Sequence, residues 1–97
     1  MAKILFHPDV YQEIEASWSW YQNKADGLGD DFLRELESAY QLIQQLPTTW
    51  PLFQKGFRRY LLLRFPYSVI YRERGGELLV VAIMHNSRKT GYWLQRA

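Results

Sequence analysis

The chain has 97 residues, enough for one small domain, and its hydrophobic content of 47% excludes general disorder. Without cysteine it has no disulfides, thiolate metal ligands or thiol nucleophile. The formal charge of +2 hides a division: residues 1–48 carry three basic and eight acidic side chains, and residues 49–97 carry nine basic and two acidic. The two halves therefore face different partners, or each other.

No apolar run reaches the ~18 residues that a membrane helix needs, and acidic residues appear too early for a signal peptide. No repeat or linker divides the sequence. We expect residues 1–97 to form a single domain of a soluble cytoplasmic protein that does not contact membranes.

The N-terminal half predicts a strand followed by two helices. A strand is expected over Lys3–His7, and a helix should begin at Pro8 and end near Gly27 and Gly29. Its apolar stripe consists of Val10, Ile14, Trp18 and Tyr21.

Asp30 or Asp31 is expected to cap the second helix, and Pro47 to end it. The apolar face of this helix consists of Phe32, Leu36, Ala39, Tyr40, Ile43 and Leu46. A connection this short predicts an antiparallel helical hairpin.

The C-terminal half predicts a loop and three strands. The loop carries Trp50 and Phe53, which the pattern assigns neither to the core nor to a partner contact. The predicted strands are Phe57–Phe65, Tyr67–Arg74 and Glu77–His85. Gly75 and Gly76 favour a tight turn between the last two, and the last is apolar on both faces, which predicts an interior position.

These elements predict an α+β fold, β-α-α-β-β-β, with an antiparallel sheet packed on the N-terminal helical hairpin. One sheet face would then stay partly open, and arginines could gather there. The candidate target-binding residues are Arg58, Arg59, Arg64, Arg72, Arg88 and Trp93. Positive charge beside aromatic rings suits phosphates and bases, although such arginines also serve as solvated residues or as ion-pair partners of acidic helices.

Several chemistries lack the residues they need. There is no glycine-rich phosphate loop, and His7 and His85 stand apart from other metal ligands, so neither a metal nor another cofactor is expected. Ser68 and Ser87 lie in no nucleophile elbow. His85 suits either a strand end or proton transfer, and Tyr92 and Trp93 suit packing of the C-terminus on the core.

Three segments together resemble one known family. They are the run Arg58–Arg72, which contains Phe65-Pro66-Tyr67, then Val81–Arg88, and finally Tyr92-Trp93. The pattern resembles the RelE/ParE family of type II toxins, also called plasmid stabilisation proteins, over nearly the whole chain. The resemblance implies the α+β fold above and a cognate antitoxin whose disordered segment folds around the toxin in a hetero-oligomer.

Members of that family act on two different targets. Those similar to RelE are ribosome-dependent messenger RNA endonucleases, and those similar to ParE inhibit DNA gyrase. If this chain is a ribonuclease, the resemblance assigns catalysis to His85, Arg88 and Tyr92. Metal-free cleavage needs positioned cations, each worth about 3 kcal/mol of transition-state stabilisation.

The sequence lacks part of that catalytic set. Ser68 follows Tyr67 where RelE-like members have an arginine, and leucines occupy positions 61–63 where lysines are expected. The sequence therefore favours a ParE-like toxin that inhibits gyrase. The alternatives are a RelE-like endoribonuclease and a non-toxic family member that acts only as a binding module.

Overall fold

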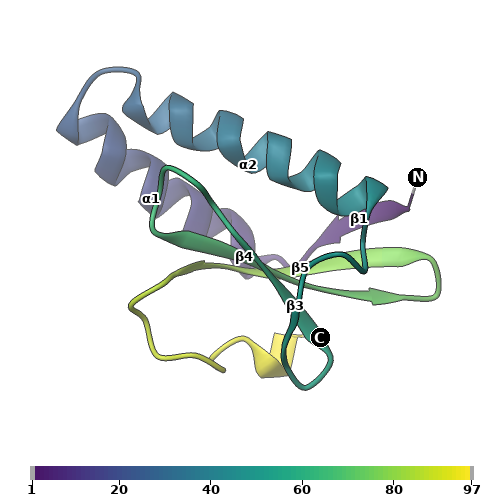
Figure 1. The fold of residues 1–97 in the computed structure, drawn as a ribbon. Coiled ribbons are helices and arrows are strands. Elements are labelled where there is room, and N and C mark those ends of the chain that lie inside the picture. The colour runs from purple at the N-terminus through teal and green to yellow at the C-terminus, as the bar shows by residue number, and fades with distance from the viewer. Residues whose placement is uncertain (1, 97) are drawn as a thin grey trace.

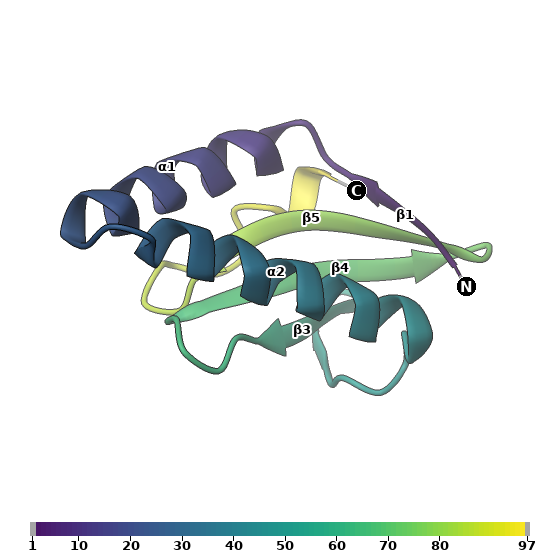
Figure 2. The same cartoon turned by 90° about the horizontal axis from the view of Figure 1, so that it is seen from above.

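Two helices lie side by side on one face of a five-stranded sheet, and the C-terminal segment crosses the other face (Figures 1 and 2). This arrangement comes from a computed structural model that describes residues 2–96. The elements are β1 (Lys3–Phe6), α1 (Asp9–Lys24), α2 (Leu28–Gln45), β2 (Leu52–Gln54), β3 (Phe57–Leu61), β4 (Tyr67–Arg74), β5 (Glu77–His85) and the 3₁₀ turn Leu94–Arg96. The predicted α+β class and helical hairpin are confirmed.

The sheet has the order β1-β5-β4-β3-β2 and is mixed. Strands β2 to β5 pair antiparallel, but β1 runs parallel to β5, because two helices intervene before the chain returns to the sheet. The predicted antiparallel sheet is confirmed for β2 to β5, and β1, whose pairing the prediction did not specify, adds a parallel edge strand. The predicted loop contains the short strand β2. Strand β5 lies between β1 and β4, as its apolar pattern predicts.

The start of α2 differs from the prediction. Helix α2 begins at Leu28 after Gly27, whose φ of 82° is readily adopted by glycine, and no side chain caps the helix. The carboxylates expected as caps are used elsewhere: Asp30 accepts a hydrogen bond from Trp18 Nε1, and Asp31 pairs with Arg34. The turn at Gly27, and not a capping side chain, therefore sets the start of α2 and allows it to pack against α1.

Strand β3 ends at Leu61, four residues before the predicted end. Beyond it, the Glu35 carboxylate on α2 accepts the amide hydrogens of Leu63 and Arg64, which holds the chain as a loop instead of a strand. Leu63 is 92% exposed as a result. Strands β4 and β5 match their predicted bounds, and Gly75 and Gly76 take positive φ angles in the turn between them.

The sheet separates two apolar clusters. The larger lies against the helices and is built around buried side chains of α2, β4 and β5, among them Phe32, Leu36, Val69, Tyr71 and Val80. Trp50 packs edge-on against Tyr60 at its border. Leu46, predicted on the buried face of α2, is instead 51% exposed, because it lies just beyond the helix end.

The smaller cluster lies on the opposite face of the sheet, beneath the C-terminal segment. Its buried members are Phe57, Ile70, Val81, Ala82, Met84 and Trp93. Phe53 stacks against Trp93, with ring centroids 6.0 Å apart, so the two aromatic residues of the predicted loop both pack on the core. The sheet face expected to be open is thus covered over part of its area.

Candidate functional site

The C-terminal segment covers Trp93 completely. Its side chain is 0% exposed and meets Phe57 at 4.8 Å between ring centroids. A ring in this position stabilises the domain and presents no surface to a target. Burial of the ring therefore argues against the predicted role of Trp93 in target binding and agrees with the alternative, packing of the C-terminus on the core.

Two of the predicted target-binding arginines are engaged within the chain. Arg58 donates hydrogen bonds to the carbonyl oxygens of Thr48 and Trp50, at 3.3 and 2.7 Å, and thereby fixes the loop after α2. Arg59 donates to Ser68 Oγ at 2.8 Å and to Asn86 Oδ1 at 3.1 Å. Both guanidinium groups have structural partners, which leaves them little freedom to bind a target.

The Arg59 contacts give Ser68 a role that the sequence did not indicate. Ser68 is fully buried, and its hydroxyl also donates to Asn86 Oδ1 at 2.5 Å. Asn86 begins the turn that follows β5 and leads to Arg88. The residue at position 68 therefore joins β3, β4 and the turn that carries Arg88.

Arg64 pairs with a carboxylate on α2. Its Nη1 lies 3.5 Å from Asp31 Oδ2 at the helix surface. The hydrogen bond from Arg34, with a smaller contribution from Arg64, lowers the pKa of Asp31 below its usual value. This ion pair is of the kind considered above, between an arginine and an acidic helix, and surface pairs of this type contribute little to stability.

Arg72 and Arg88 have no ion-pair partner among residues 2–96. The Arg72 guanidinium lies 5.2 Å from the centre of the Phe57 ring, and its Nε is buried without a protein acceptor in the described chain. The Arg88 guanidinium lies 3.6 Å from the centre of the Tyr92 ring. Unlike Arg58, Arg59 and Arg64, these two candidates have neither an ion pair nor a side-chain hydrogen bond within residues 2–96.

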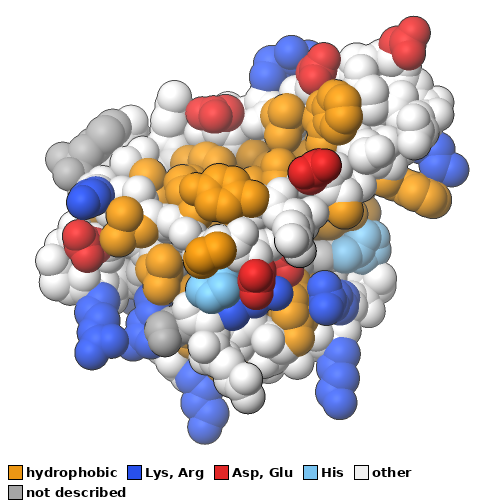
Figure 3. Space-filling view, turned by 180° about the vertical axis from the view of Figure 1, so that it is seen from behind, with side chains coloured by type: hydrophobic (Ala, Val, Ile, Leu, Met, Phe, Trp, Pro, Cys, Tyr) orange, Lys and Arg blue, Asp and Glu red, His pale blue; other side chains and the backbone are white. Residues whose placement is uncertain are grey.

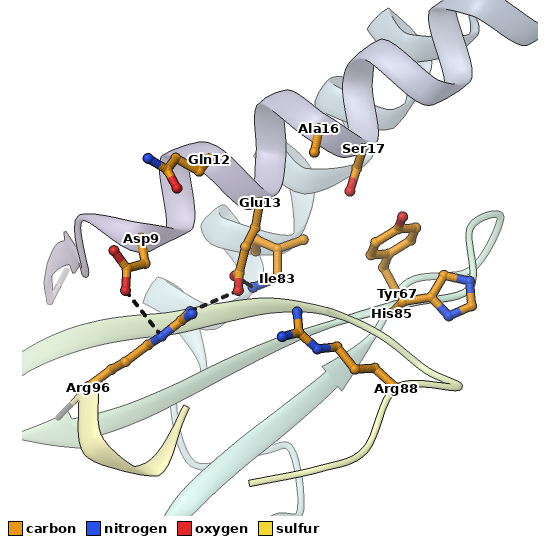
Figure 4. A pocket seen from close by; sticks show the side chains of 10 residues that line it. All are labelled: Asp9, Gln12, Glu13, Ala16, Ser17, Tyr67, Ile83, His85, Arg88 and Arg96. Atoms are coloured by element: carbon orange, nitrogen blue, oxygen red, sulfur yellow. Dashed lines mark hydrogen bonds and ion pairs between the residues drawn. The ribbon is translucent and has the colours of Figure 1, made fainter. Parts of the chain in front are cut away.

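Arg88 reaches into a cavity of about 450 Å³ between α1, β5 and the C-terminal segment (Figure 4). Tyr67 and His85 line the side toward the β3–β4 loop, and Glu13 and Arg96 line the opposite side. His85 Nδ1 accepts hydrogen bonds from the backbone N–H of Ser87 at 3.1 Å and from its hydroxyl, 2.8 Å away, if Nε2 carries the proton.

Glu13 and Arg96 form an ion pair that no local sequence pattern indicates. Arg96 Nη1 lies 2.8 Å from Glu13 Oε2 and also donates to the Val81 carbonyl, and Glu13 Oε1 accepts the Ile83 N–H. Strand β1 pairs with β5 only as far as Val80, so these side chains satisfy backbone groups at an edge that β1 leaves unpaired. Neighbours 83 positions apart cannot be found from local sequence.

The three residues assigned to catalysis under the ribonuclease alternative are only partly brought together. His85 and Arg88 share the cavity, but Tyr92 lies beneath Arg88 and outside the cavity lining. Burial, and then the charge of Glu13, raise the pKa of Tyr92 to about 12. A phenol with this pKa is a poor proton carrier at neutral pH.

Charge is divided between the two sides of the molecule. Many of the lysine and arginine side chains gather along the lower side in Figure 3, which is the side of the C-terminal segment in Figure 1. Most of the acidic residues belong to α1 and α2. Within residues 2–96, no three His, Asp or Glu side chains are grouped to hold a metal ion, and no helix is long and apolar enough to cross a membrane.

Fold and surface together define a small α+β protein with a basic side, an acidic helical hairpin and no grouped metal ligands in the described range. Its fold is similar to that of a chain in a solved structure described as the chromosomal ParDE TA system from P. aeruginosa. The two are 19% identical, with a TM-score of 0.64, and the alignment covers 88% of this chain and 96% of that one. No curated protein matches this chain.

The family model described as "ParE toxin of type II toxin-antitoxin system, parDE" matches residues 4–90. The chain belongs to this family, and the resemblance found in the sequence is confirmed. It is a ParE toxin of a type II toxin–antitoxin system, and membership implies an antitoxin partner.

Proposed function

We propose that this ParE toxin inhibits DNA gyrase and that a cognate antitoxin neutralises it. The match of residues 4–90 to the ParE family is the observation that carries the proposal. Exposed leucines support it: Leu61 is 54% exposed and Leu63 is 92% exposed, at positions where a ribonuclease of this family would carry cations. Apolar side chains held in water suit a protein partner better than a phosphate chain.

Arg88 is the candidate through which the toxin would bind an acidic group of its target. Its guanidinium is exposed, points into the cavity and has no carboxylate partner within residues 2–96. Arg64 and Arg72 can contribute at the surface. Arg58 and Arg59 contribute by shaping the loops, since their hydrogen bonds are internal.

The gyrase proposal is tested by plasmid supercoiling with purified toxin. The wild-type toxin should inhibit supercoiling, and addition of the antitoxin should restore it. Arg88→Gln should weaken inhibition, whereas Lys89→Gln, a neighbouring exposed charge, should not. Undiminished supercoiling at large molar excess of folded toxin would contradict the proposal.

Primer extension on messenger RNA after induction distinguishes the endoribonuclease alternative. Cuts at fixed codon positions that Arg88→Ala abolishes would establish that alternative instead. Unchanged growth after induction, with neither effect, would indicate a binding module without toxicity. The raised pKa of Tyr92 and its place outside the cavity favour the absence of cuts.

A further inference from the structure

A second group of cations lies at the far end of the sheet, away from the Arg88 cavity. This end of the sheet holds the β2–β3 and β4–β5 turns, because Arg58 pairs with Tyr71 and Lys3 with Glu77. Its four cations are Lys3 on β1, Lys55 in the β2–β3 turn, and Arg72 and Arg74 on β4. We call these four residues the sheet-end patch. None forms an ion pair with any Asp or Glu among residues 2–96.

The strand registers place three of these cations on one face. Lys3 and Arg74 are both paired with Glu77, so their side chains project to the same side of the sheet. Arg72 lies two residues before Arg74 and shares that side, over Phe57 of the smaller apolar cluster. This face lies opposite the helices.

The face is hollowed between the charges. Leu5, Leu79, Arg72, Arg74 and Glu77 line a depression of about 380 Å³. No residue of the C-terminal segment, as far as Arg96, lines this depression. The positive charge of the patch is therefore open to a ligand.

We propose that the sheet-end patch binds the phosphate backbone of duplex DNA. Unneutralised lysines and arginines on one face match a regular polyanion, and most of the protein's acidic residues lie on the opposite side. The resulting dipole would turn the patch toward DNA and the helices away from it. This DNA contact adds to the proposed gyrase inhibition and can be measured without gyrase.

The patch suits a duplex better than a single strand. Proteins that bind single strands stack bases on exposed rings, but the aromatic side chain at this site, Phe57, is 2% exposed and lies beneath Arg72. Contacts limited to phosphates carry no base information, so binding should be independent of sequence.

Glu77 provides a sharp test because it is an acidic residue that lines the depression beside Arg72 and Arg74. Glu77→Gln should tighten DNA binding by removing repulsion of the phosphates. Glu73→Gln is the matched control: Glu73 is paired with Leu78, which belongs to the helix-facing cluster, so its side chain points to the opposite side. It should change affinity far less.

The experiment is fluorescence anisotropy of a labelled DNA duplex with the full-length toxin at several salt concentrations. The dissociation constant should be on the order of 10⁻⁴–10⁻⁶ M at physiological salt. Arg74→Gln, which removes one phosphate contact at an exposed position, should weaken binding about five-fold at ~0.15 M salt and reduce the salt slope by about 0.9. Lys24→Gln, on the helical side, should do neither.

Three results would overturn the proposal. One is no binding at low salt, and another is equal weakening by Arg74→Gln and Lys24→Gln. The third is that Arg74→Gln weakens binding to gyrase but leaves DNA affinity unchanged, which would show that the patch binds an acidic protein surface. Failure of DNA binding with intact inhibition of supercoiling would leave the proposed function standing and remove only the DNA contact.

Discussion

The burial of Trp93 predicts a large loss of stability when the ring is removed. A buried tryptophan withdraws roughly 200 Å² from water, worth about 5 kcal/mol at ~25 cal/mol per Å², and substitution of buried aromatic residues by alanine typically costs about 3–5 kcal/mol. Against this, Trp93 Nε1 is buried without a protein acceptor in residues 2–96, and removing an unsatisfied donor returns about 1 kcal/mol. We expect Trp93→Ala to lower the free energy of unfolding by about 2–4 kcal/mol.

Urea unfolding followed by far-ultraviolet circular dichroism measures this change. In thermal unfolding, at ~4–8 °C per kcal/mol for a domain of this size, the melting temperature should fall by at least about 8 °C. Trp93→Phe should lose much less, because it keeps a ring against Phe57 and removes the unsatisfied N–H. If Trp93→Ala costs less than about 1 kcal/mol and target binding is lost, the ring contacts the target and the packing described here is incorrect.

Three further substitutions test the fold and the site. Gly29→Ala should cost about 1–2 kcal/mol in urea unfolding, because the added Cβ would lie 2.7 Å from the Trp18 carbonyl oxygen. This clash outweighs the gain in helix propensity. A more stable variant would show that α1 and α2 pack less closely than described. Glu13→Gln should cost about 2 kcal/mol and speed amide hydrogen exchange in residues 86–96, because Arg96 loses its nearest carboxylate. The exposed control Glu15→Gln should cost less than about 0.5 kcal/mol. Equal effects of the two substitutions would show that the Glu13–Arg96 ion pair has no structural role. Burial raises the pKa of Tyr71 to about 12, so the unfolded chain loses the Tyr71 proton at lower pH than the folded chain, and stability should fall as the pH rises from about 10 to 12. Tyr71→Phe should cost about 1 kcal/mol at neutral pH, because it removes the hydrogen bond to the Pro47 carbonyl, but it should lose less stability over this alkaline range. An alkaline loss equal to that of the wild type would contradict the raised pKa of Tyr71.

Local signals predicted the elements that depend on local chemistry. Strands β4 and β5 match their predicted bounds because their apolar residues and the Gly75-Gly76 turn are adjacent in sequence. The end of β3 was missed because it depends on Glu35, 28 positions from the amide of Leu63. The parallel pairing of β1 likewise arises only when both helices are in place.

The site follows the same division. The sequence identified Arg72 and Arg88 as candidates, and both keep their charge unneutralised within residues 2–96. It could not show that Arg59 is bound by Ser68 and Asn86, because the partners lie on separate elements. The sequence position of an arginine indicates that its side chain can bind a phosphate or a carboxylate. The fold determines whether that side chain is free to bind a target or is already held by other residues of the chain.

The supercoiling assay tests the central claim most directly. With gyrase and relaxed plasmid, increasing amounts of the toxin should reduce supercoiling, the antitoxin should reverse the effect, and Arg88→Gln should need a higher dose than Lys89→Gln. Full supercoiling in the presence of excess toxin, shown to be folded by its cooperative unfolding in urea, would contradict the account.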